Sequence, residues 1–415
     1  MKIKETQGIT LIAVIITIIV LAILAGVAIA NIGGSDSIIN NAKKAVGLYN
    51  SKADEETTQL SELQRQLEEY ASGGGSTGGN TGGSSGGNDN TGGTTITYPT
   101  KQIATGGSVA TSNVTIVPSS DNPNNLQIVI PAGFAPAVLQ TGNTQSLPGQ
   151  DGSVKGIMAN EEWKNITADD INKGIVVVDA EWNEFVWIPV LDIDKFKRDS
   201  WDGTSSQVTF SNSAYWEETN TNMGNSVSTN KGFYIARYEA SKDSTATIAQ
   251  SKRGQFVWNN VSQTDAITAA SKYNTTLNSH LIYGTEWDTV LNWLVGNAYA
   301  SSPTEGALPT LMKVEYVRSN SANWGNYRNS TGNAVVGSGK LEPTGTSEYW
   351  KANNIYDLAG NVWEWTQEKY GTGTTRAYRG GSYDYDGSGY PAARRNGYAE
   401  SYARGYIGFR VSFYL

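Results

Sequence analysis

An uninterrupted apolar segment near the start of the chain is the strongest constraint on the fold. Residues 9–30 read ITLIAVIITIIVLAILAGVAIA and contain no charged residue. A helix of about 20 apolar residues spans the hydrocarbon core of a bilayer, so we expect a transmembrane helix over residues 9–31. Lys2 and Lys4 precede it, which places the N-terminus in the cytoplasm and the rest of the chain at the cell surface. A cleaved secretory signal is the alternative, but its apolar region is shorter.

The residues at the start of this segment resemble the leader and mature start of type IV prepilins and pseudopilins. The matching stretch is Gln7-Gly8-Ile9-Thr10-Leu11-Ile12. In that family a peptidase cuts after the glycine, and the new N-terminal residue is methylated. The resemblance therefore implies a leader over residues 1–8 and processing between Gly8 and Ile9. The chain departs from the family at Ala13, where a glutamate is usual, and a plain membrane anchor is the alternative.

Two polar segments follow the apolar one. Apolar residues alternate at spacings of three and four along residues 35–71, which predicts a coiled-coil-like stalk helix. Its apolar strip, residues 39–70, would pack against other pilin-like subunits; an amphipathic helix without such neighbours is the alternative. Residues 72–95 are rich in Gly, Ser and Asn, which predicts a flexible linker.

Composition excludes several kinds of chemistry. The 415 residues include no cysteine and one histidine, His280, so thiolate metal sites, cysteine nucleophiles and centres built from several imidazoles are excluded. The formal net charge is −8. Since a nucleic-acid partner requires a basic stripe, we expect none.

The remaining chain predicts an α+β fold. Residues 96–165 indicate an irregular β-rich region, and residues 174–179, 184–190 and 233–239 indicate strands. Ser262-x-x-Asp265 and Thr285-x-x-Asp288 resemble capping boxes, each opening a helix. Strands and helices in this arrangement are typical of the α+β class.

Three motifs in the C-terminal third resemble the formylglycine-generating-enzyme family of sulfatase-modifying factors. They are the stretch NIYDLAGNVWEW at residues 354–365, Arg379-Gly380-Gly381-Ser382, and Gly408-Phe409-Arg410. They follow the family order, and the resemblance extends over about residues 170–415. It implies an elaborated C-type-lectin-like α+β domain, which we assign to residues 166–415.

The first motif indicates a calcium site. Asp357 and Glu364 supply hard anionic oxygens, and the turn between them directs carbonyl groups inward, a donor set that suits calcium. The resemblance implies a structural Ca²⁺ held by Asp357, Gly360, Val362 and Glu364. In the alternative interpretation Asp357 caps a turn and Glu364 pairs with an arginine, Arg379 or Arg410. We expect Trp363 and Trp365 to pack in the core.

The same resemblance bears on catalysis. Catalytic members of the family bind copper through two cysteines in the loop after the RGGS motif. Counted from Ser382 without gaps, those positions fall near Tyr385 and Tyr390. A related branch uses iron held by three histidines, which this chain lacks. We therefore expect no copper and no enzymatic activity.

The loop itself has the composition of a binding surface. Tyrosine mixed with Ser, Gly, Asn and Asp is typical of antibody-like paratopes. The loop also resembles the variable proteins of diversity-generating retroelements, which carry a hypervariable ligand surface on the same fold. The candidate ligand-binding residues are Tyr383, Asp384, Tyr385, Asp386, Ser388, Tyr390, Asn396, Tyr398, Glu400, Ser401, Tyr402 and Tyr406.

The sequence therefore predicts a non-catalytic cell-surface protein that binds or adheres to an extracellular protein or glycan. The alternative is structural: a minor pilin or pseudopilin of a type IV pilus or of a type II secretion-like filament.

Overall fold

The computed structural model describes residues 102–103, 106–117, 127–140, 152–198, 220–296, 314–335, 339–371 and 373–415. These residues all lie in one compact unit, Gly92–Leu415. The predicted leader with Gly8 and Ile9, the transmembrane helix, the stalk and the linker lie outside the described residues. Within the described ranges, every helix is too short or too polar to cross a membrane.

The described residues form a sheet of eight strands. Its order is β1 (Gln102–Ile103), β5 (Val154–Ile157), β4 (Phe134–Leu139), β6 (Val176–Asp179), β7 (Glu184–Pro189), β8 (Gly232–Ala236), β18 (Val411–Phe413) and β11 (His280–Leu281). Only β1 and β5 pair in parallel. The three strands predicted over residues 174–239 are confirmed as β6, β7 and β8. The third ends at Ala236 because Glu239 turns into the core, where Val362 N donates to it.

The boundary expected at residue 165 does not divide two structural units. β4 pairs with β6 across it, with Phe134 opposite Asp179 and Pro136 opposite Val177. The Phe134 ring packs on Phe185 and Phe413, with centroids 6.0 and 5.4 Å away. The β-rich region therefore completes the core of the C-terminal domain, because without β4 these rings would lose part of their cover.

Helices follow the expected pattern with one correction. They are α3 (Ala168–Lys173), α4 (Thr221–Asn230), α5 (Gln263–Ser271), α6 (Gly284–Leu294) and α7 (Val314–Arg318), with 3₁₀ turns at Asn160–Asn165, Ile193–Lys195, Thr275–Leu277, Gly332–Val335 and Glu348–Trp350. Ser262 caps α5 as predicted, accepting from Asp265 N. The cap predicted at Thr285 is wrong: α6 begins after Tyr283, whose backbone N donates to Glu286. Asp288 does not cap the helix because its carboxylate pairs with two arginines.

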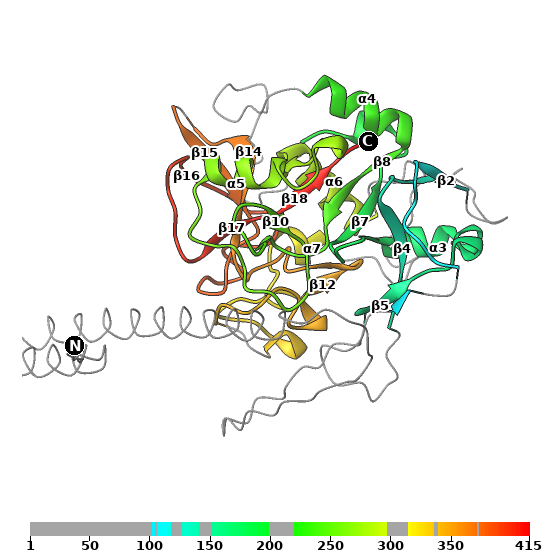
Figure 1. Ribbon diagram of the computed structural model, residues 1–415. Coiled ribbons are helices and arrows are strands. Elements are labelled where there is room, and N and C mark those ends of the chain that lie inside the picture. Colours follow the sequence, from blue (N-terminus) through cyan, green and yellow to red (C-terminus); the bar gives the residue numbers. More distant parts are fainter. Residues whose placement is uncertain are drawn as a thin grey trace, which may run out of the picture. The chain divides into compact units, whose positions relative to one another are not determined.

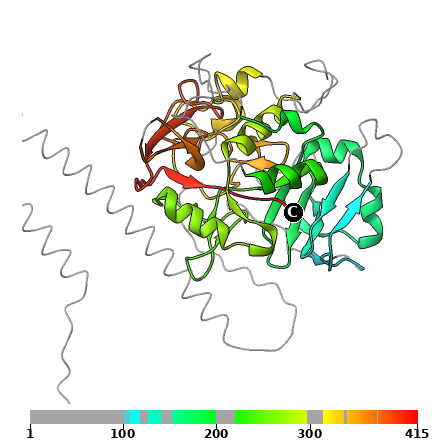
Figure 2. The same cartoon turned by 90° about the horizontal axis from the view of Figure 1, so that it is seen from above.

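A second sheet carries the C-terminal motifs. Its order is β16 (Arg395–Ala399), β15 (Thr375–Arg379), β14 (Trp363–Lys369) and β17 (Ile407–Phe409). Two-stranded pairs complete the described β-structure: β2 (Val114–Ile116) with β3 (Ile128–Ile130), β9 (Ser241–Lys242) with β10 (Ala249–Gln250), and β12 (Lys351–Ala352) with β13 (Ile355–Tyr356). Figures 1 and 2 place the four-stranded sheet at one side of the unit and the first strands at the other. This mixture of helices and largely antiparallel sheets confirms the α+β class.

Tryptophan fills much of the core. Trp187, Trp287, Trp293, Trp350, Trp363 and Trp365 are among the largest fully buried side chains. The prediction that Trp363 and Trp365 pack in the core is confirmed. Both lie on β14, so the signature motif forms the inner strand beneath the surface described below.

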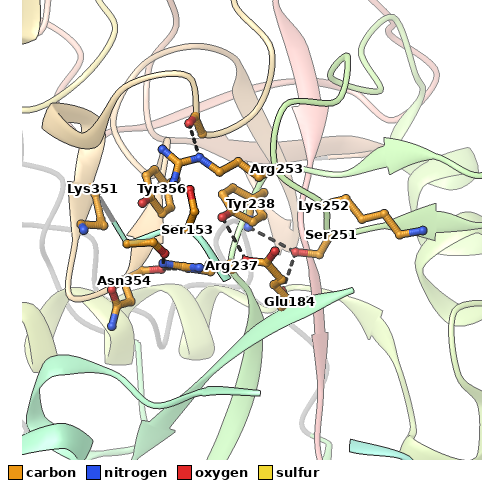
Figure 3. Close-up of polar contacts among 12 residues, drawn as sticks. Ser153, Glu184, Arg237, Tyr238, Ser251, Lys252, Arg253, Lys351, Asn354 and Tyr356 are labelled. Carbon is orange, nitrogen blue, oxygen red and sulfur yellow. Dashed lines mark hydrogen bonds and ion pairs between the residues drawn. The ribbon is translucent and has the colours of Figure 1, made fainter. Parts of the chain in front are cut away.

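A buried polar network surrounds Arg237, just after β8 (Figure 3). The Arg237 guanidinium donates to Glu184 at 2.8 Å, to the Gly152 carbonyl at 2.7 Å and to the Asn354 carbonyl at 2.9 Å. The Tyr238 hydroxyl donates to the same Glu184 carboxylate at 3.0 Å. These bonds fix the turn before β5 against the start of the signature motif.

A second arginine extends the network. Arg253 donates to Ser153 Oγ at 2.7 Å and pairs with Glu348, whose carboxylate also accepts from the Tyr356 hydroxyl at 2.6 Å. The Arg237 and Arg253 guanidinium carbons lie 5.1 and 4.9 Å from the Tyr356 ring centroid. Since the donors of this network have partners, we interpret the network as structural. It orders Tyr356, which directly precedes Asp357 in the signature motif.

Candidate functional site

Two buried arginines fix the ends of residues 380–394, the first part of the candidate binding region, which continues through β16 to Tyr406. Arg379 ends β15 and Arg395 begins β16. Their Nε atoms donate to Glu368 at 2.9 and 2.6 Å, and both guanidinium groups pair with Asp288. Burial would raise the pKa of Glu368, but Arg395 and Arg379 outweigh it and lower that pKa to about 2. The loop between the two strands therefore starts and ends on one rigid, fully charged cluster.

The predicted ligand-binding residues lie at or near the surface. Ser388, Tyr398 and Ser401 are exposed. The other nine are partly buried: Tyr383, Asp384, Tyr385, Asp386, Tyr390, Asn396, Glu400, Tyr402 and Tyr406. None of the twelve is fully buried.

Five of the predicted tyrosines converge on one surface, and the buried Tyr378 packs beneath them. We call the six residues the tyrosine patch: Tyr378, Tyr385, Tyr390, Tyr398, Tyr402 and Tyr406. The buried Trp363 forms its floor, with ring centroids 4.9 Å from Tyr378, 5.7 Å from Tyr390 and 6.0 Å from Tyr385. Tyr385 packs edge to face on Tyr390 at 4.6 Å and on Tyr406 at 6.1 Å. These T-shaped contacts hold the rings in defined orientations.

The outer part of the tyrosine patch is a stack of rings. Tyr398, with 51% of its surface exposed, lies over Tyr402 with 3.8 Å between ring centroids. The Arg404 guanidinium carbon lies 4.3 Å from the Tyr402 centroid, and the Tyr402 and Tyr406 hydroxyl oxygens are 2.9 Å apart. Burial and the bond to Tyr402 raise the pKa of Tyr406 above that of an ordinary phenol. The patch offers apolar ring surface together with phenol hydroxyl groups.

The acidic candidates are held by local partners. Asp386 pairs with Arg328 at 3.0 Å, Glu400 pairs with Arg376 at 2.9 Å, and Asp384 accepts from Ser382 Oγ at 2.7 Å. The carbonyl oxygen of the Asn396 side chain accepts from Gly397 N at 2.9 Å. These residues border the patch.

Three candidates are not joined to the patch. Across the described ranges, Tyr383, Ser388 and Ser401 make no side-chain hydrogen bond or aromatic ring contact with it. Burial raises the pKa of Tyr383, whose backbone N donates to the Asn361 carbonyl.

Sequence reasoning missed Tyr378. It lies on β15, directly opposite Asn396 on β16, before the RGGS motif where the predicted loop begins. Burial raises its pKa, and the neighbouring phenols of Tyr385, Tyr402, Tyr370 and Tyr398 raise it further, which places it among them. Side chains alternate between the two faces of a strand along residues 375–379, and this alternation could have indicated the orientation of Tyr378. It does not show which tyrosines lie beside Tyr378 unless the register of β15 on β16 is known.

The residues expected to bind calcium are arranged differently from a free donor set. Both Glu364 oxygens accept from Arg410, from Nε at 3.0 Å and from Nη2 at 2.6 Å. Asp357 Oδ2 accepts from Gly345 N at 2.7 Å, whereas its Oδ1 is buried without a hydrogen-bond partner. Burial raises the pKa of Asp357 to about 7. The described residues contain no group of three or more His, Asp or Glu side chains suited to a metal ion.

The alternative in which Glu364 pairs with an arginine is confirmed, and that arginine is Arg410. Arg410 also lies near the buried carboxyl groups of Glu239 and Asp357, so one guanidinium faces three acidic side chains. Gly360 has a separate role. Its φ is +77°, and a Cβ there would lie 2.0 Å from the Asn326 carbonyl oxygen, so only glycine permits this close backbone approach.

Fold and site together define an α+β domain that carries an aromatic surface on its C-terminal residues, between β15 and β17. Residues 200–413 match the model of the Sulfatase-modifying factor enzyme 1-like domain. Because this match covers more than half of the 415 residues, the chain belongs to that family. The resemblance drawn from the three C-terminal motifs, with its C-type-lectin-like fold, is confirmed.

Solved structures give three further similarities. PvdO from Pseudomonas aeruginosa is 18% identical, covering 57% of this chain and 96% of that one, with a TM-score of 0.33. CarF is 16% identical, covering 45% and 87%, with a TM-score of 0.30. Treponema denticola variable protein 1 is 13% identical, covering 73% and 99%, with a TM-score of 0.23. A search of curated proteins found no match.

Proposed function

We propose that this chain is a non-catalytic binding protein that captures an extracellular protein or glycan on its tyrosine patch. One observation carries the proposal. Tyr385 and Tyr390, at the positions where the family resemblance places copper-binding cysteines, are packed against each other with ring centroids 4.6 Å apart. Aromatic packing takes the place of the thiols, and it forms the centre of an accessible surface.

The chemistry of the patch supports recognition. Tyrosine provides a large, rigid contact area at low entropic cost, and its hydroxyl both donates and accepts hydrogen bonds. Tyr398 presents an exposed ring, while the Arg379–Arg395–Asp288–Glu368 cluster fixes the loop ends so that little ordering is required on binding.

The lack of thiols argues against the family's oxidation chemistry. The sequence contains no cysteine, and its single histidine, His280, is engaged at both ring nitrogens, by the Asn278 carbonyl at 2.7 Å and by Glu286 at 3.0 Å. His280 is therefore held as a structural residue. We propose accordingly that the chain neither binds copper nor oxidises a sulfatase peptide.

The cell-surface location is part of the same proposal and rests on the apolar residues 9–30. The leader processing at Gly8 and Ile9 and the packing of residues 39–70 against pilin-like subunits likewise remain sequence-based predictions. They concern how the domain is displayed, whereas the tyrosine patch concerns what it binds.

Binding can be tested on arrays of glycans and displayed extracellular proteins. Each ligand captured by the parent is measured again with Tyr398→Ala and Tyr402→Phe. Because aromatic anchors carry much of the energy of an interface, loss of the exposed Tyr398 ring in Tyr398→Ala should weaken binding by at least about tenfold. Tyr402→Phe removes only the hydroxyl that bonds Tyr406, and it should have a smaller effect.

Tyr349→Ala provides the matched control, because Tyr349 is 39% exposed but lies outside the patch. It should bind as the parent does. The proposal fails if ligands bind the Tyr398 and Tyr349 variants equally well, since binding would then occur elsewhere. It also fails if the array captures nothing while the chain, supplied with copper, oxidises a cysteine-containing sulfatase peptide.

A further inference from the structure

Arg394 borders the tyrosine patch and has unused hydrogen-bonding capacity. Its guanidinium carbon lies 5.8 Å from the Tyr390 ring centroid. Its Nε and Nη1 atoms are buried, and among the described residues neither has a hydrogen-bond partner. The side chain as a whole is only partly buried, so a small group from solvent reaches Nε and Nη1 by displacing the atoms that cover them. Buried charged donors without an acceptor are unfavourable, which makes this position unusual.

The acidic residues around the loop do not accept hydrogen bonds from Arg394 Nε or Nη1. Asp384, Asp386 and Glu400 are the acidic residues between Arg379 and Tyr406, and each is held by another partner. Asp288 and Glu368 pair with Arg379 and Arg395. Arg394 thus differs from its neighbour Arg395, whose Nε and Nη2 pair with Glu368 and Asp288 in the buried cluster.

The backbone on both sides holds Arg394 in place. The Ala393 carbonyl accepts from Arg379 Nη1, and Ala393 N donates to the Val317 carbonyl at 3.1 Å. Arg394 N donates to the Pro391 carbonyl at 2.8 Å. A positively charged group is therefore positioned beside Tyr390 before any ligand arrives, which lowers the cost of binding.

We propose that Arg394 is the anion-binding position of the tyrosine patch and that the ligand presents an oxyanion to it. A guanidinium forms charge-assisted hydrogen bonds with carboxylate, sulfate and phosphate oxygens alike. This inference rests on the proposed binding function, and it narrows the ligand to one that carries such a group next to a surface that tyrosine rings can cover. The oxyanion of the ligand can belong to an acidic side chain or to a sulfate or phosphate ester.

The test uses the full chain, labelled with ¹⁵N at arginine, and follows the Nε–Hε resonances by NMR. Sodium acetate, sodium sulfate and sodium phosphate are titrated separately, each against sodium chloride at equal ionic strength. We expect one resonance to shift saturably with an oxyanion and not with chloride. Arg394→Lys assigns that resonance by removing it, and the preferred anion distinguishes a carboxylate from an ester group.

Arg318→Gln is the matched control, because Arg318 is exposed and follows Val317, which contacts the same loop. It should leave the saturable shift unchanged. In Arg394→Gln, any residual oxyanion affinity, read from backbone amides of the loop, should fall by at least about tenfold.

The inference is overturned if no arginine resonance of the parent saturates, or if chloride produces the same shift, because the two nitrogens would then be served by water alone. This outcome is separate from the tyrosine test. Loss of ligand capture in Tyr398→Ala together with a silent Arg394 would leave the binding function in place and remove only the anion-binding role.

Discussion

Tyr385 and Tyr390 pack edge to face, with ring centroids 4.6 Å apart, and both rest on the buried ring of Trp363. Four residues separate them in sequence, and the turn between them brings them together. In the proposed function this contact stands where catalytic relatives place a pair of thiols.

This packing predicts the effect of truncating Tyr390. Tyr390→Ala should destabilise the domain by about 2 kcal/mol, less than for a fully buried aromatic, because Trp363 and Tyr385 lose a packed neighbour. Tyr390→Phe keeps the ring and should change stability by less than about 0.5 kcal/mol. Denaturant unfolding of the two variants measures the difference, and equal stabilities would contradict the role of the ring.

The arginine cluster predicts a larger loss. Arg395→Met would leave Asp288 and Glu368 to share Arg379 in a fully buried site. Removing one partner of a buried ion pair costs about 3–5 kcal/mol, since the remaining charges are left without compensation. Arg318→Met, at an exposed arginine, should stay within about 0.5 kcal/mol of the parent. Chemical unfolding followed by tryptophan fluorescence would test both, and an Arg395 variant as stable as the control would refute the assigned role.

Gly381 is predicted to tolerate no side chain. Its φ is +79°, and a Cβ would lie 2.3 Å from the Tyr390 carbonyl oxygen and 2.6 Å from the Tyr327 ring. Backbone strain and overpacking together should make Gly381→Ala cost about 2–4 kcal/mol. Gly405→Ala is the control, because nothing lies within 4 Å of a Cβ at Gly405. Melting temperatures should separate the two variants clearly; matching values would mean that the loop adjusts freely at Gly381.

His280 predicts a dependence of stability on pH. Burial would lower the pKa of His280, but the Glu286 carboxylate and the Asn278 carbonyl outweigh it and raise that pKa above its usual value. The stabilisation is therefore complete below the unfolded pKa of about 6.5 and is lost as the pH rises through the higher folded value. The two test values are pH 5.5 and pH 8.5, about one to two units either side of the unfolded pKa. His280→Gln should lose more stability relative to the parent at the lower pH than at the higher pH. Unfolding free energies over this range provide the measurement, and a constant difference would exclude the linkage.

Calcium should have no effect on stability. Because Arg410 occupies both oxygens of Glu364, addition of calcium or of a chelator is expected to leave the melting temperature unchanged. Arg410→Met should destabilise the domain by about 3–5 kcal/mol, since Glu364 would remain buried without a counter-charge. A rise in melting temperature on adding calcium to the parent would contradict this arrangement and restore the predicted metal site.

Local sequence patterns were sufficient for much of the fold. Residues 184–189 form a strand because their apolar and β-branched side chains suit a buried sheet, and Ser262 caps α5 because its hydroxyl reaches Asp265 N within one turn. The motifs around Asp357, Ser382 and Arg410 were enough to predict the family. The absence of cysteine, a property of composition, also removed thiolate chemistry without any structure.

The site required the tertiary structure. Asp288 looks like part of a helix cap in sequence, but Arg379 and Arg395, about a hundred residues away, make it a buried counter-charge. Glu364 and Arg410 are 46 residues apart, and they pair because β17 and the residue after it bring Arg410 alongside β14. Tyr378 joins the tyrosine patch only through the register of β15 on β16. Sequence by itself determined the local elements and the available chemical groups, because those depend on near neighbours. Only the folded chain decided which charges pair and which rings converge, because strand register and packing set contacts between distant segments.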